Sequence, residues 1–124
     1  MPRSKPEAEL ERQLRALLPV HGWAYMEQYR WHPDREFRAD VGIWSSPESA
    51  RMGDKPLLVE IDGASRSAKL GAHQRAAGID SDCRRSSEAL LLGYTVLRVS
   101  APMVYDGNAL IVIERLLGKV EGRQ

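Results

Sequence analysis

The sequence predicts an α/β domain in which a mixed four-stranded sheet is flanked by helices. Helical and strand-like patterns follow one another in the order helix, three strands, helix, strand, helix. A helix joins the last two strands, which predicts that they pair in parallel. With 124 residues, 43% of them hydrophobic, the chain is long enough for one core and short for two. We therefore expect a single domain over 1–124, with an N-terminal helix in 1–20 and the core in 22–117.

The N-terminal half predicts one helix and three strands. The leucines of the helix recur every three or four residues, and Pro19 is expected to end it. The first strand is rich in aromatic residues, the second alternates apolar residues with a polar face, and the third is an apolar run typical of a central strand. The three can pair as an antiparallel meander. The expected ranges are 7–18 for the helix, 23–32, 36–44 and 56–63 for the strands, and a polar loop at 45–55.

The C-terminal half predicts a helix, a strand and a second helix. The helical pattern over 75–92 ends at Gly93, a residue type common just after helices. The run 94–100 is rich in β-branched residues, as strands are, and 108–117 is amphipathic. Cys83 is expected to be a small core residue of the first helix.

The composition and charge exclude several classes of protein. No apolar run approaches the roughly 20 residues that span a bilayer, so we expect no membrane partner. The single cysteine excludes an internal disulfide, and the charged N-terminus lacks a signal sequence, so we expect a cytoplasmic protein. The net charge of +1 excludes a protein held on DNA by bulk charge alone. The charges are nevertheless unevenly spread, since residues 66–85 carry five basic and two acidic side chains, a net charge of +3.

Three carboxylates inside the predicted strands are the most informative feature. A carboxylate in a central strand is unfavourable unless it is paired or bound to a cation. Glu60 and Asp62 are two residues apart, so a strand projects both onto one face, and Asp40 joins them if the two strands pair. Mg²⁺ or Mn²⁺ would stabilise such a cluster, and a magnesium site beside a phosphate can hydrolyse phosphodiester bonds. The alternative is that the three acids are solvated on an exposed sheet face.

The helix after these acids carries a second group of polar residues. Arg75, Asp82 and Arg85 are spaced so that they form one stripe. With Lys69, the two arginines would contact a DNA backbone, while Asp82 would orient Arg85 or His73. His73 could serve as a general base or contact DNA, or it could be a surface histidine. The alternative for the stripe is a solvated helix face with an internal ion pair.

Several motifs occur together in a recognisable order. They are Tyr29-Arg30-Trp31-His32-Pro33, Phe37-Arg38-Ala39-Asp40, Leu58-Val59-Glu60-Ile61-Asp62-Gly63, His73-Gln74-Arg75-Ala76-Ala77-Gly78, Asp82 and Leu92-Gly93-Tyr94-Thr95-Val96-Leu97-Arg98. In this order they resemble small phage and bacterial endonucleases of the PD-(D/E)XK superfamily, akin to very-short-patch-repair endonucleases. The resemblance covers roughly 22–117 and implies a restriction-endonuclease-like αβββαβ core.

The resemblance also implies roles for individual residues. It makes Asp40 and Glu60 the metal ligands and Glu27 an auxiliary acid near the site, and it places a histidine where His73 stands. The family pattern has a lysine two residues after Glu60, where this chain has Asp62. The group that takes over from the lysine therefore stays open. The candidates are His73, Lys69, Arg75, or a second metal held by Asp62.

The remaining histidines and tryptophans have mainly structural interpretations. His21 and His32 are expected to be structural, and a zinc site is not expected because no pair of candidate ligands has zinc-ligand spacing. Trp23 is expected in the core, while Trp44 is open between core packing and stacking on bases.

The function predicted from the sequence is a magnesium-dependent DNA endonuclease, acting in phage or bacterial DNA processing, repair or restriction. The alternative is a catalytically silent nucleic-acid-binding domain with a nuclease fold, which the missing lysine favours. A third interpretation is an interaction module with solvated acids. DNA is the expected partner, and a homodimer is one way in which so small a core could enclose a duplex.

Overall fold

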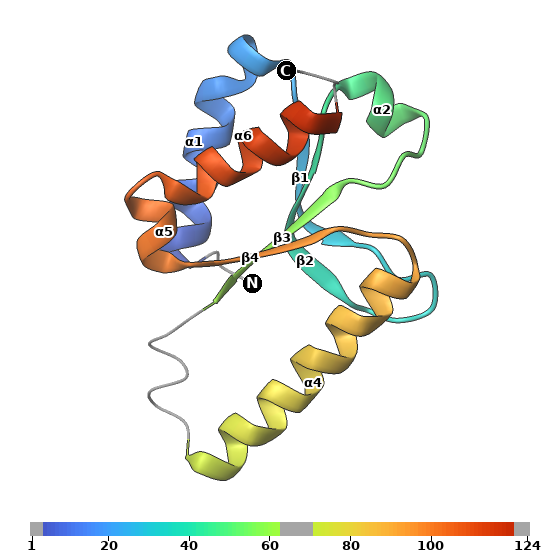
Figure 1. Cartoon of the computed structure of the whole chain (residues 1–124), viewed down its shortest axis with the longest axis vertical. Helices are drawn as coiled ribbons and strands as arrows, with labels where there is room; N and C mark the ends of the chain where they lie inside the picture. The colour runs from blue at the N-terminus through green and yellow to red at the C-terminus, as the bar shows by residue number, and fades with distance from the viewer. Residues whose placement is uncertain (1–3, 63–70, 121–124) are drawn as a thin grey trace.

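The computed structural model describes residues 4–62 and 71–120 (Figure 1). Among these, the helices and strands that the sequence predicts occur in the predicted order, with two further short helices. Their bounds are α1 Lys5–His21, β1 Ala24–Arg30, β2 Arg38–Trp44, α2 Pro47–Arg51, β3 Leu57–Asp62, α4 Ala72–Leu91, β4 Val96–Ser100, α5 Ala101–Tyr105 and α6 Asn108–Val120.

The four strands form one mixed sheet in the order β1-β2-β3-β4. The pairs β1–β2 and β2–β3 are antiparallel, whereas β3 and β4 are parallel and are connected through α4. The prediction of an α/β fold with a mixed four-stranded sheet flanked by helices is therefore confirmed. The antiparallel meander and the parallel last pair are confirmed with it.

The main core lies on the face of the sheet that α1, α5 and α6 cover (Figure 1). Leu10 and Leu14 of α1 are each 1% exposed and pack in one cluster with residues of the strands and of α6. A smaller cluster lies toward α4, where Trp31 packs with Leu58 and Ala89. Trp23 is buried in the main core, as predicted, and Trp44 is also buried.

The first helix begins with a capping box and extends past the proline that was expected to end it. The Ser4 hydroxyl accepts from the Glu7 N–H, and the Glu7 carboxylate accepts from the Ser4 N–H. Pro19 lies in the last turn, where it interrupts one hydrogen bond of the helix without ending it. The helix ends at Gly22, whose left-handed conformation lets its N–H donate to the Leu18 carbonyl at 2.8 Å.

Two short helices were missing from the sequence prediction. The segment 45–55, expected to be a polar loop, contains α2, and α5 follows β4 directly. Ser46 caps α2 and Ser100 caps α5, each through its hydroxyl, and a proline stands in the first turn of both helices. A serine cap followed by proline is a helix-start signal, so the sequence did contain the information.

One expectation about burial was wrong, and another was right only in part. The second strand was expected to have a polar face, and Arg38 is exposed and Asp40 half-buried on that face, but Gly42 and Trp44 of the same face are buried. A Cβ on Gly42 would meet Tyr29 and Pro56 side-chain atoms at 3.1–3.3 Å, so these neighbours cover the face. Cys83 was expected in the core but is exposed, because α4 contacts the sheet mainly through residues further along, such as Ala89. No helix in the described part of the chain is long and apolar enough to cross a membrane.

Truncating Leu14 to alanine should lower the free energy of unfolding by about 2–5 kcal/mol, because it leaves a cavity in the main core. The same truncation at Val20, which is 71% exposed in the same helix, should change it by less than about 0.5 kcal/mol. Urea denaturation followed by circular dichroism measures both. Equal effects of Leu14→Ala and Val20→Ala would contradict the described packing of α1.

Candidate functional site

The pairing of the strands assembles the candidate site. Val41 of β2 pairs with Val59 of β3. Because these strands are antiparallel, Asp40, which precedes Val41, lies beside Glu60, which follows Val59. On the other side of β3, the parallel register places Glu60 beside Arg98 of β4. Acids and an arginine that lie far apart in the sequence therefore meet at one end of the sheet.

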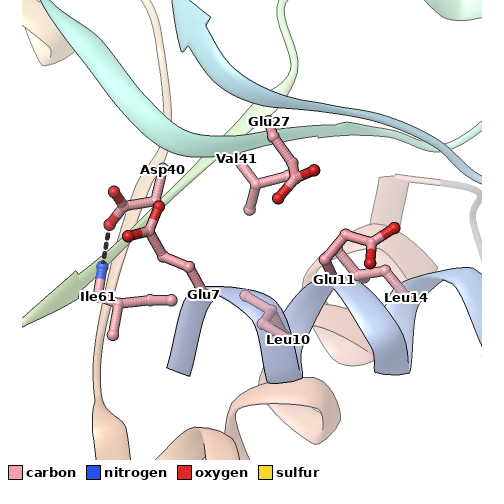
Figure 2. A pocket seen from close by; sticks show the side chains of 8 residues that line it. All are labelled: Glu7, Leu10, Glu11, Leu14, Glu27, Asp40, Val41 and Ile61. Atoms are coloured by element: carbon pink, nitrogen blue, oxygen red, sulfur yellow. Dashed lines mark hydrogen bonds between the residues drawn. The ribbon is translucent and has the colours of Figure 1, made fainter. Parts of the chain in front are cut away.

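Asp40 is held at the junction of the sheet and α1 (Figure 2). Its Oδ2 accepts from the Ile61 N–H at 2.7 Å. Burial raises the pKa of Asp40, against the lowering effect of the Ile61 N–H, and the nearby Glu7 carboxylate raises it further. A hydrogen bond from the Gln28 amide lowers the pKa of Asp40. The net shift is upward, so the folded protein holds this charge at a penalty.

Glu60 is the one charged or polar residue in the buried class among the described residues, with 9% of its surface exposed. Its Oε1 accepts from Arg85 Nη2 at 3.0 Å. Burial raises the pKa of Glu60, while the charges of Arg85 and Arg98 lower it, and the neighbouring Asp40 raises it. The upward net shift means that the nearby arginines do not fully offset the loss of hydration.

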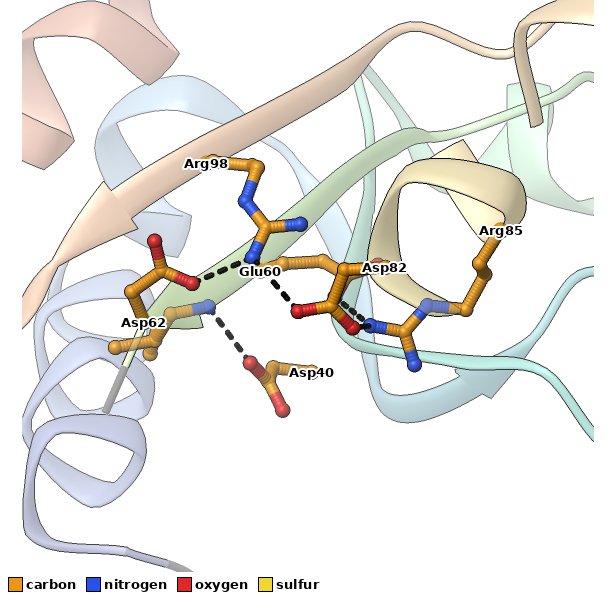
Figure 3. Close-up of polar contacts among 7 residues, drawn as sticks. Asp40, Glu60, Asp62, Asp82, Arg85 and Arg98 are labelled. Carbon is orange, nitrogen blue, oxygen red and sulfur yellow. Dashed lines mark hydrogen bonds and ion pairs between the residues drawn. The ribbon is translucent and has the colours of Figure 1, made fainter. Parts of the chain in front are cut away.

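Asp82 of α4 links two arginines, Arg85 and Arg98, beside these acids (Figure 3). Arg85 Nη2 lies 3.0 Å from Asp82 Oδ1, and Arg98 Nη2 lies 3.5 Å from Asp82 Oδ2. Arg98 also pairs with Asp62 Oδ1 at 2.5 Å. Arg85 Nε is buried without a hydrogen-bond partner among the described residues. The site is thus an alternating arrangement of carboxylates and guanidinium groups.

A small pocket between α1 and the sheet gathers further acids beside Asp40. Glu7, Glu11 and Glu27 line it together with Asp40 and apolar residues (Figure 2). Its volume of about 10 Å³ is close to what one water molecule needs. Glu27, the auxiliary acid that the resemblance implies, therefore lies at the same pocket as Asp40 but comes from the neighbouring strand β1.

Of the other predicted site residues, some make contacts that the structure describes, and some lie outside the described residues. Asp82 and Arg85 pair with each other, and Arg85 also pairs with Glu60, a contact that the stripe on the helix did not predict. Lys69 lies outside the described residues, and the side chains of His73 and Arg75 lie outside the described part of α4. The remaining histidines make structural contacts: His21 stacks on Trp23 and contacts Glu114 at 2.7 Å, and His32 contacts Glu88 at 2.9 Å.

Sequence reasoning missed two residues that the fold brings to the site. Arg98 is the one charged residue in the otherwise mostly apolar strand β4. A charge inside a strand is the same unusual feature that singles out Asp40, Glu60 and Asp62. Glu7 belongs to the capping box of α1, so its pattern has a purely local interpretation. Only the folded chain brings Glu7 close enough to Asp40 to raise its pKa.

Asp40 and Glu60 fit a hard divalent cation by their chemistry. Both supply carboxylate oxygens, they lie on adjacent strands, and burial raises the pKa of each, so a positive ion would relieve an existing penalty. With the side chains as they stand, the described residues contain no group of three or more His, Cys, Asp or Glu arranged to hold a metal ion. The residues that fit a metal ion are therefore the pair Asp40 and Glu60, because Asp62 is turned toward Arg98 and accepts its hydrogen bond.

Replacing Asp40 by asparagine should stabilise the metal-free protein at pH 7. The raised pKa means that the folded state binds the Asp40 proton more tightly than the unfolded state does. Stability is therefore lost as the pH rises from the ordinary carboxyl pKa through the raised folded value. Asparagine keeps an oxygen for the Ile61 N–H but carries no charge.

We expect thermal unfolding in EDTA to show a higher Tm for Asp40→Asn at pH 7, by roughly 4 °C for each kcal/mol regained, and little difference at pH 3. The exposed control Glu36→Gln should leave the Tm nearly unchanged at both pH values. A Tm for Asp40→Asn that is lower than wild type at pH 7 would show that the Asp40 charge is stabilising.

No family model, no curated protein and no solved structure matches this chain. Asp40, Glu60 and the side chains around them are therefore the features of the molecule that bear on its function.

Proposed function

We propose that this protein is a metal-dependent DNA endonuclease that hydrolyses phosphodiester bonds. The observation that carries the proposal is the pair of half-buried and buried acids, Asp40 and Glu60, on adjacent strands beside two arginines. Acids that are buried in a sheet and only partly compensated reduce stability, so their presence at one point favours a functional role over a solvated face. The resemblance to PD-(D/E)XK nucleases points to the same two residues.

In this proposal Asp40 and Glu60 hold Mg²⁺ or Mn²⁺. Bound there, the ion would supply a water molecule of lowered pKa and positive charge beside the phosphate. Asp40 would stay oriented by the Ile61 N–H, which donates to its Oδ2. Glu27 and Glu7 lie near enough to Asp40 to help order water in the small pocket.

The arginines are the groups that would hold the DNA backbone. Guanidinium groups recognise phosphate oxygens through paired hydrogen bonds. Arg85 has an unpartnered buried Nε, and Asp82 keeps its guanidinium beside Glu60. Lys69 and Arg75, from the segment with net charge +3, would extend this contact along the strand. We place the activity in DNA processing, repair or restriction in a bacterial or phage-infected cytoplasm, with the protein acting alone or as a homodimer.

Cleavage assays test the proposal directly. Plasmid, linear, branched and single-stranded DNA should be incubated with Mg²⁺, Mn²⁺ or EDTA. We expect cleavage of at least one substrate with metal and none with EDTA, and a loss of about a hundredfold or more in Asp40→Asn and Glu60→Gln. Glu48→Gln, an exposed acid in α2, is the matched control and should cleave as the wild type does. Undiminished cleavage by Glu60→Gln would contradict the proposal.

A second candidate function is supported by one observation. Glu60 and Asp62 are each already paired with an arginine, an arrangement that suits a nuclease fold kept only for binding nucleic acid. This candidate predicts no cleavage of any substrate, together with DNA binding that survives both EDTA and Asp40→Asn. Fluorescence anisotropy with labelled DNA distinguishes it from the endonuclease.

A further inference from the structure

We propose that Arg98 is the catalytic cation of the site, contacting the phosphate that is cleaved, and that Asp62 positions Arg98 and is not a metal ligand. The inference rests on the proposed endonuclease function and names a residue that the sequence patterns did not single out for the reaction. It also assigns Asp62 a role different from the third metal ligand expected from its spacing to Glu60.

The parallel pairing of β3 with β4 puts Arg98 where this role requires it. Arg98 lies directly beside Glu60 in the register, and Asp62 lies beside Ser100. The Arg98 side chain reaches toward the acids and lies between Asp62 and Asp82 (Figure 3). Its charge also acts on Glu60, where it lowers the pKa against the effect of burial.

The hydrogen bonds of Arg98 leave part of its guanidinium available for a ligand. Both ion pairs, to Asp62 at 2.5 Å and to Asp82 at 3.5 Å, use Nη2. Within the described residues, Nε and Nη1 of Arg98 make no hydrogen bond, and 35% of the side chain is exposed. Two carboxylates thus fix one corner of the guanidinium while its other N–H groups can donate to phosphate oxygens.

Asp62 is poorly suited to hold a metal while it makes this contact. Its Oδ1 accepts from Arg98, and its side chain is 60% exposed, unlike that of Glu60. A guanidinium that close would repel a divalent ion bound to the same carboxylate. The family pattern places a cation at position 62, and here an acid at that position recruits a cation from the adjacent strand. The positive charge is therefore present at the site, although it comes from β4.

The chemistry gives this charge a defined task. In hydrolysis the oxygen of water bonds to phosphorus while the bond from phosphorus to the leaving sugar oxygen breaks. The water gives up a proton, the leaving oxygen takes one up, and the products are a phosphate monoester and an alcohol. Negative charge grows on the phosphate oxygens and on the leaving oxygen during this exchange. A fixed guanidinium stabilises that charge more than it stabilises the starting diester.

The test combines single-turnover cleavage rates with Mn²⁺ affinity measured by titration calorimetry. Arg98→Ala should lower the cleavage rate by about 10²–10³-fold, the loss seen when one stabilising donor is removed from an active site. It should not weaken Mn²⁺ binding. Asp62→Asn should lower the rate by a smaller factor and also leave Mn²⁺ affinity within about threefold, whereas Asp40→Asn should abolish the Mn²⁺ site.

Recovery of cleavage in a second set of variants distinguishes a need for positive charge at the site from a purely structural role of Arg98. The double variant Asp62→Lys with Arg98→Ala returns a cation from β3 and should recover cleavage to within about tenfold of the wild type. Arg98→Lys should retain more activity than Arg98→Ala because it keeps the charge. Arg30→Ala, which removes an exposed arginine from the end of β1, is the matched control and should cleave normally. Thermal unfolding of every variant checks that the fold is retained.

The outcomes of this inference and of the proposed function are distinguishable. If the wild type cleaves no DNA, both the proposed endonuclease function and the role of Arg98 are wrong. If the wild type cleaves and Asp40→Asn does not, but Arg98→Ala keeps more than about a tenth of the rate, only the role of Arg98 is overturned. A loss of Mn²⁺ binding in Asp62→Asn equal to that in Asp40→Asn would make Asp62 a metal ligand and overturn its positioning role.

Discussion

The burial of Glu60 is the constraint on which the surrounding arrangement depends. Its carboxylate lies within the sheet and is paired with Arg85, which follows 25 residues later in α4. Removing one partner of a buried ion pair typically destabilises a protein by about 3–5 kcal/mol, because the other charge is left without compensation. Among the described side chains of α4 only Ala89 is in the buried class. The position of α4 on the sheet is therefore tied to the charge at Glu60 as well as to apolar packing.

The same constraint connects the fold to the proposed chemistry. Asp40 and Glu60 both have pKa values raised by burial, so the protein keeps two negative charges where hydration is poor. Arg85 and Arg98 compensate them only in part, and Asp82 holds both arginines in place. In the proposed function, a divalent cation at the acids and a phosphate at the arginines would together complete the compensation of these charges.

The sequence predicts the order of the elements well because the patterns that encode it are local. Aromatic, alternating, apolar and β-branched runs predicted the strands, and helical spacing predicted α1, α4 and α6. A helix between the last two strands implied their parallel pairing. The short helices α2 and α5 were missed because a helix of five residues has too few positions to display a period. Cys83 was misplaced because periodicity identifies a helical face without saying how much of that face another element covers.

The candidate site was predictable only in part, for a similar physical reason. Asp40, Glu60 and Asp82 could be proposed because acids in strands are unusual and because helix spacing is regular. The position of Arg98 depends on the register between β3 and β4, which the sequence of either strand leaves undetermined. Glu7 reaches Asp40 only because α1 packs across the sheet. The lone charge of Arg98 in an apolar strand is a local signal, but nothing local indicates that Arg98 or Glu7 lies beside the strand acids.

A crystal of the protein soaked in Mn²⁺ tests the central claim most directly. Anomalous scattering locates manganese without any assumption about function. We expect a peak within coordination distance of carboxylate oxygens of Asp40 and Glu60, close to the roughly 2.1 Å typical of Mg²⁺. The Asp62–Arg98 contact should persist beside that peak. Absence of manganese at this position in a fully soaked crystal, or a peak bound by other acids instead, would contradict the account.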